Sequence, residues 1–212
     1  MPDRADRHLR ALRLARDCAE LGARIRTIHL ITGLAPAMVQ RLFFPDPLAT
    51  TRGRPPNSLD WYHSANLIAR AESSIFIALY RRLRSTGFAA GEALVSAYRA
   101  YCAICRAPQR ISFDRAFDLA SHTDGIWLAR EPVFEVLACP ACESQYLSAL
   151  GTLPGTRGEC PFCKLLQRYP ADPRLQASFP SGPPLDPAAL RQGIMALWRV
   201  PGRDADADNR PE

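Results

Sequence analysis

Lysine is nearly absent from this chain. Of its 27 basic residues 26 are arginine, and Lys164 is the single lysine. The arginine guanidinium is a rigid fork of donors that matches phosphate and guanine, so this bias favours contacts with nucleic acid. Genome base composition alone can produce the same bias, and a nucleic-acid partner therefore needs independent support.

Long apolar runs are absent too. The longest candidate, residues 75–80, is followed directly by Arg81 and Arg82, and it is far shorter than the roughly 18 residues that cross a bilayer. The N-terminus has neither the apolar core nor the small-residue cleavage site of a secretion signal. We therefore expect a soluble, cytoplasmic protein with no membrane partner.

The chain also has few histidines. There are four of them, His8, His29, His63 and His122. Neither they nor the carboxylates show a spacing that would place an acid, a base and a nucleophile together. The sequence therefore predicts a protein that is not an enzyme.

The net charge of +6 is unevenly distributed. Residues 1–110 contain 17 arginines and 8 acidic residues, which gives +9, whereas residues 111–212 contain 10 basic and 13 acidic residues, which gives −3. Such asymmetry favours a polyanionic partner for the first half of the chain. A basic face that only contacts solvent is the alternative.

Four of the seven cysteines form two Cys-x-x-Cys pairs. Cys139 and Cys142 make the first pair, Cys160 and Cys163 the second, and the 17 residues 143–159 lie between them. This spacing is typical of a four-thiolate zinc site. Such a site is closed to water and substrate, so we expect one structural Zn²⁺ per chain. Two disulfides, which need an oxidising compartment, and a dithiol redox centre, which needs a thioredoxin-like context, are the alternatives.

A third Cys-x-x-Cys pair, Cys102 and Cys105, falls in a predicted helix. It has no further ligand nearby in the sequence, and cysteine is among the most buried residue types. We interpret both residues, and Cys18 likewise, as core thiols.

Apolar residues at helical spacing predict a multi-helix body. Helices are expected over residues 3–21, 58–83 and about 91–105, and from Ser112 onward, the last continuing or restarting through 126–130. Ser58 is the expected cap of the second of these, while Gly87 and Pro108 are the expected breaks. The helix over 58–83 is apolar enough to be the central core helix.

Residues 23–42 have the layout of a helix-turn-helix, with Gly33 at the turn and Pro36 in the first turn of the second helix. The predicted inward positions are Ile25, Ile28, Leu34, Val39 and Leu42. Because His29 occupies a position where a small residue is usual, a purely structural helical hairpin is the alternative. The candidate DNA contacts are Arg24, Arg26, Gln40 and Arg41 in this segment, and Arg52 and Arg54 in the proline-rich loop that follows.

The second half predicts a small metal module and an extension. Alternating residues 132–138 predict a strand that leads into the first cysteine pair, with residues 145–150 as its hairpin partner. The fold class is therefore mainly α: a helical body over 1–131, a zinc-binding module over 132–169, and a proline-rich extension over 170–212. The extension is expected to hold a short helix over 187–198 and a disordered acidic end over 203–212.

Five features, in their order along the chain, resemble the flagellar transcriptional activator family FlhC. They are Glu20-Leu-Gly-Ala-Arg-Ile-Arg, Leu59-Asp-Trp-Tyr, Thr86-Gly-Phe, Tyr98-Arg-Ala-Tyr and the paired Cys-x-x-Cys motifs, which together span roughly residues 10–168. The resemblance implies a helical body whose zinc ligands are Cys139, Cys142, Cys160 and Cys163. It also implies a heterohexamer of two FlhC and four FlhD chains that binds promoter DNA upstream of flagellar (class 2) operons and recruits RNA polymerase.

The chain departs from the family's pattern after the second cysteine pair, where a proline-rich acidic end replaces a basic tail. The Cys102/Cys105 pair and the rarity of lysine are also unusual. A divergent paralogue that regulates non-flagellar genes is therefore an alternative. A zinc-stabilised interaction module, whose basic face binds an acidic protein, is another.

Overall fold

The computed structural model describes residues 3–46, 60–105, 107–150 and 160–179. The chain divides into two compact units, residues 1–168 and 169–212. The predicted fold class is confirmed: the described residues are mainly helical, and the first unit ends in a small module that holds four clustered cysteines. The division of the chain at residues 131 and 169 stays a prediction.

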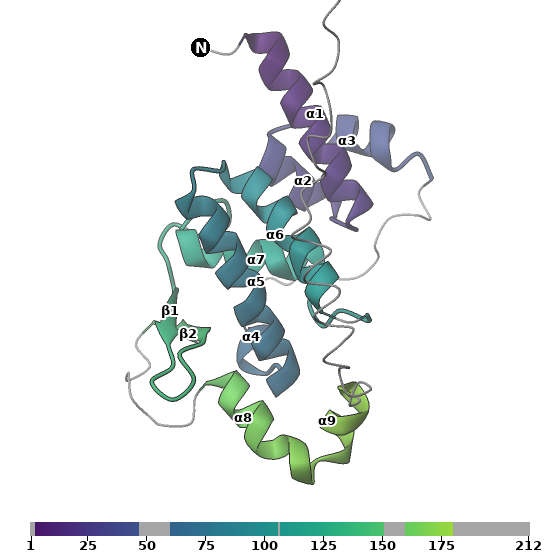
Figure 1. Ribbon diagram of the computed structural model, residues 1–212. Helices are drawn as coiled ribbons and strands as arrows, with labels where there is room; N and C mark the ends of the chain where they lie inside the picture. The colour runs from purple at the N-terminus through teal and green to yellow at the C-terminus, as the bar shows by residue number, and fades with distance from the viewer. Residues whose placement is uncertain (1–2, 47–59, 106, 151–159, 180–212) are drawn as a thin grey trace, which may run out of the picture. The chain divides into compact units, whose positions relative to one another are not determined.

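The N-terminal part is built from three helices (Figure 1), α1 (Arg4–Glu20), α2 (Ile25–Thr32) and α3 (Pro36–Phe43). Asp3 caps α1, and Gly33 makes the turn between α2 and α3 in the left-handed conformation at φ 73°. The predicted two-helix layout is thus present. Leu42 was expected to face inward, but its side chain is 49% exposed, and the inward position of this turn is held by the fully buried Val39.

The centre of the first unit is helical as predicted, with one correction. The helix expected over 58–83 is two helices, α4 (Asp60–His63) and α5 (Leu67–Ser85). The break occurs because the Asn66 side chain accepts a hydrogen bond from the Ala69 amide at 2.9 Å and so begins a new helix. The expected cap, Ser58, lies outside the described residues.

Helices α6 (Ala90–Ile104) and α7 (Phe113–Asp124) pack against α5. Ser112 caps α7 as predicted. The helix does not continue through 126–130, because Gly125 ends it in the left-handed conformation at φ 67° and Trp127 also has a positive φ of 55°. Aromatic rings from all three helices fill the core; they are Phe76, Tyr80, Tyr98, Tyr101 and Phe113.

A buried polar network ties the segment before α7 to α5 and α6. Glu72 accepts hydrogen bonds from the Tyr101 hydroxyl and, at 2.8 Å, from the Arg110 amide. The Tyr98 hydroxyl donates to the Ile111 carbonyl at 3.1 Å. These bonds satisfy polar groups that would be costly to bury alone, and they fix the backbone at residues 110–111.

The predicted hairpin is present as β1 (Phe134–Ala138) and β2 (Gln145–Ala149), antiparallel, with Phe134 opposite Ala149. It packs on α5 and α4 through two polar contacts: the Leu147 amide donates to Ser74 Oγ of α5 at 3.1 Å, and the hydroxyl of Tyr62 in α4 donates to the Leu147 carbonyl at 2.8 Å. The metal module is therefore fastened to the helical body and does not form a separate compact unit.

Three helices in the described residues were not predicted. Helix α8 (Pro161–Arg168) follows the second cysteine pair. In the second unit, the 3₁₀ helix η2 (Tyr169–Ala171) precedes α9 (Pro173–Ser178), whose first amides, those of Arg174 and Leu175, are capped by Asp172. The expected loop over 153–158, the helix over 187–198 and the acidic end over 203–212 lie outside the described residues.

Candidate metal centre

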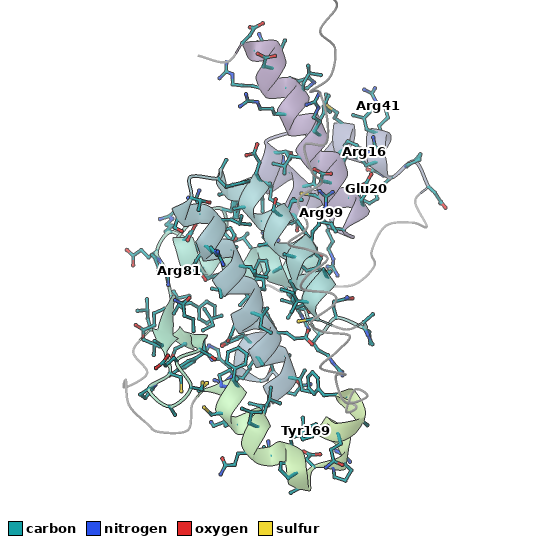
Figure 2. All side chains as sticks on the ribbon, in the orientation of Figure 1. Arg16, Glu20, Arg41, Arg81, Arg99 and Tyr169 are labelled. Atoms are coloured by element: carbon teal, nitrogen blue, oxygen red, sulfur yellow. The ribbon has the colours of Figure 1, made fainter. Side chains whose placement is uncertain are left out.

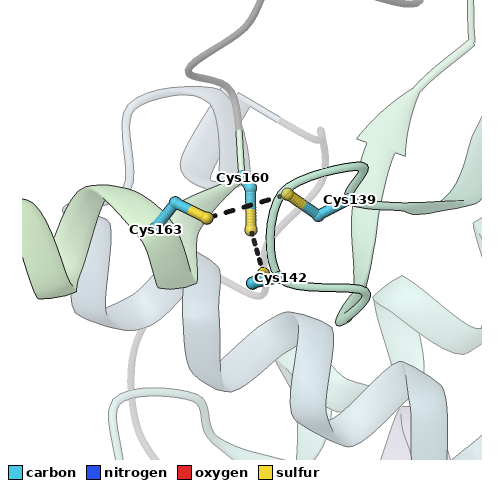
Figure 3. Close-up of side chains that lie close together, drawn as sticks. All are labelled: Cys139, Cys142, Cys160 and Cys163. Carbon is cyan, nitrogen blue, oxygen red and sulfur yellow. Dashed lines mark hydrogen bonds between the residues drawn. The ribbon is translucent and has the colours of Figure 1, made fainter.

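Four cysteines converge where the hairpin meets α8 (Figure 3). Cys139 directly follows β1, and Cys142 lies in the turn that leads to β2. The turn closes tightly, with the Cys139 amide donating to the Ser144 carbonyl at 3.0 Å. Cys160 immediately precedes α8, and Cys163 lies in the first turn of that helix. Each Cys-x-x-Cys pair thus directs both of its sulfur atoms toward one point.

The spacing of the sulfur atoms is that of a tetrahedron. Cys139 Sγ lies 3.7 Å from Cys163 Sγ, and Cys142 Sγ lies 3.7 Å from Cys160 Sγ. All four sulfurs lie within 4.8 Å of one another. Four sulfurs at about 2.3 Å from a central ion would be separated by about 3.8 Å along each edge. A disulfide would need about 2.05 Å, so the four are free thiols arranged for a metal ion.

The electrostatics of the cluster favour a bound cation. Hydrogen bonds from Ser144 lower the pKa of Cys142 to about 6, whereas hydrogen bonds with Cys142 and Cys139 raise the pKa of Cys163 to about 12. Four sulfurs this close cannot all become thiolates in the absence of positive charge. A divalent cation would compensate that repulsion, and binding would release protons.

The surroundings of the four cysteines make a small closed core. Cys139 and Cys160 are buried, Cys142 and Cys163 are half-buried, and Leu137, Tyr146 and Phe162 pack against them. No sulfur is left free to activate a substrate once all four are engaged. Chemically the arrangement can hold structure together, and soft sulfur donors of this kind select zinc or iron–sulfur centres over magnesium or calcium.

The other three cysteines lie outside this cluster. Cys18 is a core thiol as predicted, and burial raises its pKa to about 12. Cys102 and Cys105 are only half-buried at the edge of the core, and burial raises the pKa of Cys105 to about 11. Thiols with raised pKa values are mostly protonated at neutral pH and poorly nucleophilic.

The predicted DNA contacts have unequal surroundings. Arg26, Gln40 and Arg41 are exposed, and Arg41 projects from α3 in Figure 2. Arg24 is half-buried, with its Nε 3.2 Å from an Asp114 carboxylate oxygen. These assignments stay predictions. Arg52 and Arg54 lie outside the described residues.

Asp114 is a structural residue that the sequence did not reveal. It lies in α7, yet it accepts hydrogen bonds from the Arg24 amide at 3.1 Å and from Thr27 Oγ1 at 2.6 Å. It therefore caps α2 from a helix 90 residues further along the chain. No local pattern could have indicated this contact, because the two residues are 90 positions apart. The start of α2 has no capping side chain of its own.

The fold and the cysteine cluster together define a helical protein with a metal-suited centre that ties a hairpin to a helix. Within that class the family is clear: the family model described as "Flagellar transcriptional activator (FlhC)" matches residues 6–173. The chain therefore belongs to the FlhC family, as predicted, and this is a family of transcription regulators and not of enzymes. No curated protein matches the chain. Among its described residues, no helix combines the length and the apolar character that crossing a bilayer requires.

Proposed function

We propose that this chain is the DNA-binding subunit of a cytoplasmic activator complex. In the complex, two copies combine with four copies of an FlhD-type partner, bind promoter DNA upstream of flagellar operons and recruit RNA polymerase. The observation that carries this proposal is the family match over residues 6–173, which covers the first unit from residue 6 of α1 through the cysteine cluster and α8.

The basic N-terminal part is the proposed DNA-binding surface. Exposed arginines line α1 at positions 4, 7, 10 and 13, and Arg26, Gln40 and Arg41 are exposed on α2 and α3. Guanidinium groups on such a surface contribute phosphate contacts, while Gln40 and Arg41 on the second helix are suited to base edges. Arg52 and Arg54 are retained as minor-groove or backbone contacts. Arg24 stays a proposed contact beside its ion pair with Asp114.

One Zn²⁺ per chain is the proposed metal, with Cys139, Cys142, Cys160 and Cys163 as its ligands. Two sulfur pairs lie at the edge length of a zinc tetrathiolate and all four sulfurs lie within 4.8 Å of one another, which supports this assignment. When bound, the ion supplies positive charge that stabilises four thiolates. The protein's own residues position the four sulfurs. The Ser144 carbonyl closes the turn that holds Cys139 and Cys142, and α8 holds Cys163 next to Cys160.

The test is a gel-shift titration of the complex, made by co-expressing the chain with an FlhD-type partner, on duplexes from upstream of flagellar operons. Affinity should fall steeply with salt, with a log–log slope near −0.9 per phosphate neutralised. Binding to an acidic protein without any binding to DNA would overturn the proposal and favour the interaction-module alternative. Binding restricted to non-flagellar promoters would identify a divergent paralogue.

A further inference from the structure

A polar hollow of about 590 Å³ lies at the start of α7, where that helix meets α2, α4 and α6. We call it the arginine hollow. The lining residues that matter for its chemistry are Arg24, Trp61, Arg110, Ser112, Asp114 and Arg115. Three arginines and one aspartate give these residues a formal charge of +2. The hollow belongs neither to the cysteine cluster nor to the exposed residues of α3.

The single carboxylate of the hollow is already neutralised. Asp114 accepts from the Arg24 amide and from Thr27, and it forms an ion pair with the Arg24 guanidinium. The charge that remains comes from Arg110 and Arg115. Within the part of the chain that the structure describes, neither of these two guanidinium groups forms an ion pair with a carboxylate. Among the described lining residues the hollow therefore carries a net positive formal charge, which comes from Arg110 and Arg115.

Contacts hold the guanidinium of Arg115 and the backbone of Arg110 in place. The Arg115 guanidinium lies 5.0 Å from the centre of the Trp61 ring, and the Trp61 indole donates to Asp118 at 2.8 Å, which holds the ring in place. The Arg110 backbone is fixed by the hydrogen bond that its amide donates to the Glu72 carboxylate at 2.8 Å. A site whose groups are held before a ligand arrives loses less conformational entropy on binding than a mobile one.

Two further features match a phosphate with an attached organic group. The twelve-residue helix α7 begins at the hollow with Ser112 as its cap, and a helix start carries partial positive charge. A volume of about 590 Å³ is much larger than one phosphate needs and falls within the range of small-ligand sites. Trp61, which is half-buried, adds aromatic surface to the wall, on which a base can pack.

We propose that the arginine hollow binds the phosphate of a nucleotide, with Arg110 and Arg115 as the phosphate ligands and Trp61 beside the nucleoside. The nucleotide is either a free molecule or one unit of a nucleic-acid strand. The free-nucleotide source does not depend on the proposed function, whereas the DNA source rests on it. Because Arg24 both lines the hollow and precedes α2, a bound nucleotide would lie directly against the start of the two-helix unit.

The experiment uses the full chain in its complex with the FlhD-type partner. Isothermal titration calorimetry measures binding of four nucleoside monophosphates, AMP, GMP, CMP and UMP, with adenosine and inorganic phosphate as comparison ligands. At least one monophosphate should bind, while adenosine should not and inorganic phosphate should bind more weakly. Arg110→Ala and Arg115→Gln should each weaken binding about tenfold or more, the effect expected when a charge-assisted hydrogen bond is lost.

The matched control is Arg81→Ala. Arg81 is an exposed arginine on α5 that does not line the hollow, and it projects from the helix in Figure 2. This variant has the same charge change as Arg110→Ala and should bind nucleotide as the unchanged chain does. Equal weakening by Arg81→Ala and Arg110→Ala would show a general charge effect and would overturn the site.

The measurements distinguish a free nucleotide from a nucleotide of DNA, and failure of the proposed site from failure of the proposed activator function. If free nucleotides do not bind, but Arg110→Ala weakens a duplex gel shift at least tenfold while Arg81→Ala does not, the nucleotide belongs to DNA. If neither free nucleotides nor duplex DNA depend on Arg110 and Arg115, the inference is wrong. A normal gel shift of the unchanged complex in that case leaves the activator function standing. Inorganic phosphate binding as tightly as every monophosphate would contradict the nucleoside part of the site.

Discussion

Cys139 and Cys163 occupy two corners of the sulfur tetrahedron, so replacing either one removes a ligand that the other three cannot supply. Cys139→Ser and Cys163→Ser should lose the proposed Zn²⁺ and unfold the module that follows Ala138, because metal binding in such sites also stabilises the fold. Metal content by mass spectrometry is the measurement. Cys102→Ser and Cys105→Ser should retain full zinc. Loss of metal from that pair would disprove the ligand assignment.

The metal-free cluster should show uneven thiol reactivity. The pKa of Cys142 is lowered to about 6, so this thiol is mostly thiolate at pH 7 and becomes protonated as the pH falls below 6. The pKa of Cys163 is raised to about 12, so Cys163 is protonated over the same range. Alkylation of chelator-treated protein should label Cys142 first at pH 7 and lose that preference near pH 5. Equal rates at pH 7, read by peptide mass spectrometry, would contradict the lowered pKa.

Ser74 is a single residue on which the docking of the hairpin depends. Its buried Oγ accepts from the Leu147 amide, and Ser74→Ala would leave that buried donor without its partner. The expected loss of unfolding free energy is about 1–3 kcal/mol. Thermal or denaturant unfolding measures it. Ser85→Ala, a change at an exposed serine on the same helix, is the control and should have an effect of less than about 0.5 kcal/mol.

At the scale of elements, two glycines hold the N-terminal helices in different ways. Gly33 adopts a positive φ between α2 and α3, and a Cβ there would meet no atom within 4 Å. Gly33→Ala should therefore cost only backbone strain, about 1 kcal/mol. A Cβ on Gly91 would lie 2.7 Å from Leu14 and 3.0 Å from Ile31, because α6 approaches α1 and α2 closely there.

Gly91→Ala should accordingly force the helices apart and cost more than Gly33→Ala, about 1–3 kcal/mol as overpacking does. Unfolding curves of the two variants give the comparison. If Gly91→Ala is the milder change, the close approach of α6 to α1 is not tight in solution.

Several elements with a local signal were predicted from the sequence, but one with a clear signal was overlooked and one break was missed. Ser112 and Gly33 acted as cap and turn as expected, and the cysteine spacing predicted the cluster. The break at Asn66 was missed because the apolar pattern runs on through it. Helix α9 begins with the same Asp-Pro signal that predicted the helix over 187–198, so its signal was present and overlooked.

The contacts that join distant elements had no signal at all. Asp114 contacts the start of α2, and Ser74 accepts from the Leu147 amide of β2. Neither residue has a sequence pattern that indicates its partner, because each partner is brought close only by the tertiary fold. The arginine hollow belongs to the same group, because Arg24 and Trp61 join the segment 108–115 only in the tertiary fold.

At the scale of the whole molecule, several large apolar side chains are exposed to solvent. Leu9 is 53% exposed, Leu42 is 49% exposed and Leu166 is 73% exposed. Expressed alone, the chain should aggregate or form ill-defined oligomers, because its exposed apolar side chains have no partner surface. Co-expression with an FlhD-type partner should give a single complex that contains two copies of this chain and four of the partner. Light scattering after size exclusion decides between them. A stable monomer at moderate concentration would contradict the obligate complex.

Because Asp114 lies 90 residues after Arg24, its contact with the start of α2 can form only late in synthesis of the chain. A ribosome that adds roughly 5 to 20 residues per second reaches position 114 some 5 to 18 seconds after Arg24 has been made. During that interval the Arg24 amide and the Thr27 hydroxyl at the start of α2 do not have the Asp114 carboxylate as their acceptor. The N-terminal helices are thus completed only when the middle of the chain has emerged, and a nascent chain halted before α7 would carry an unfinished two-helix unit.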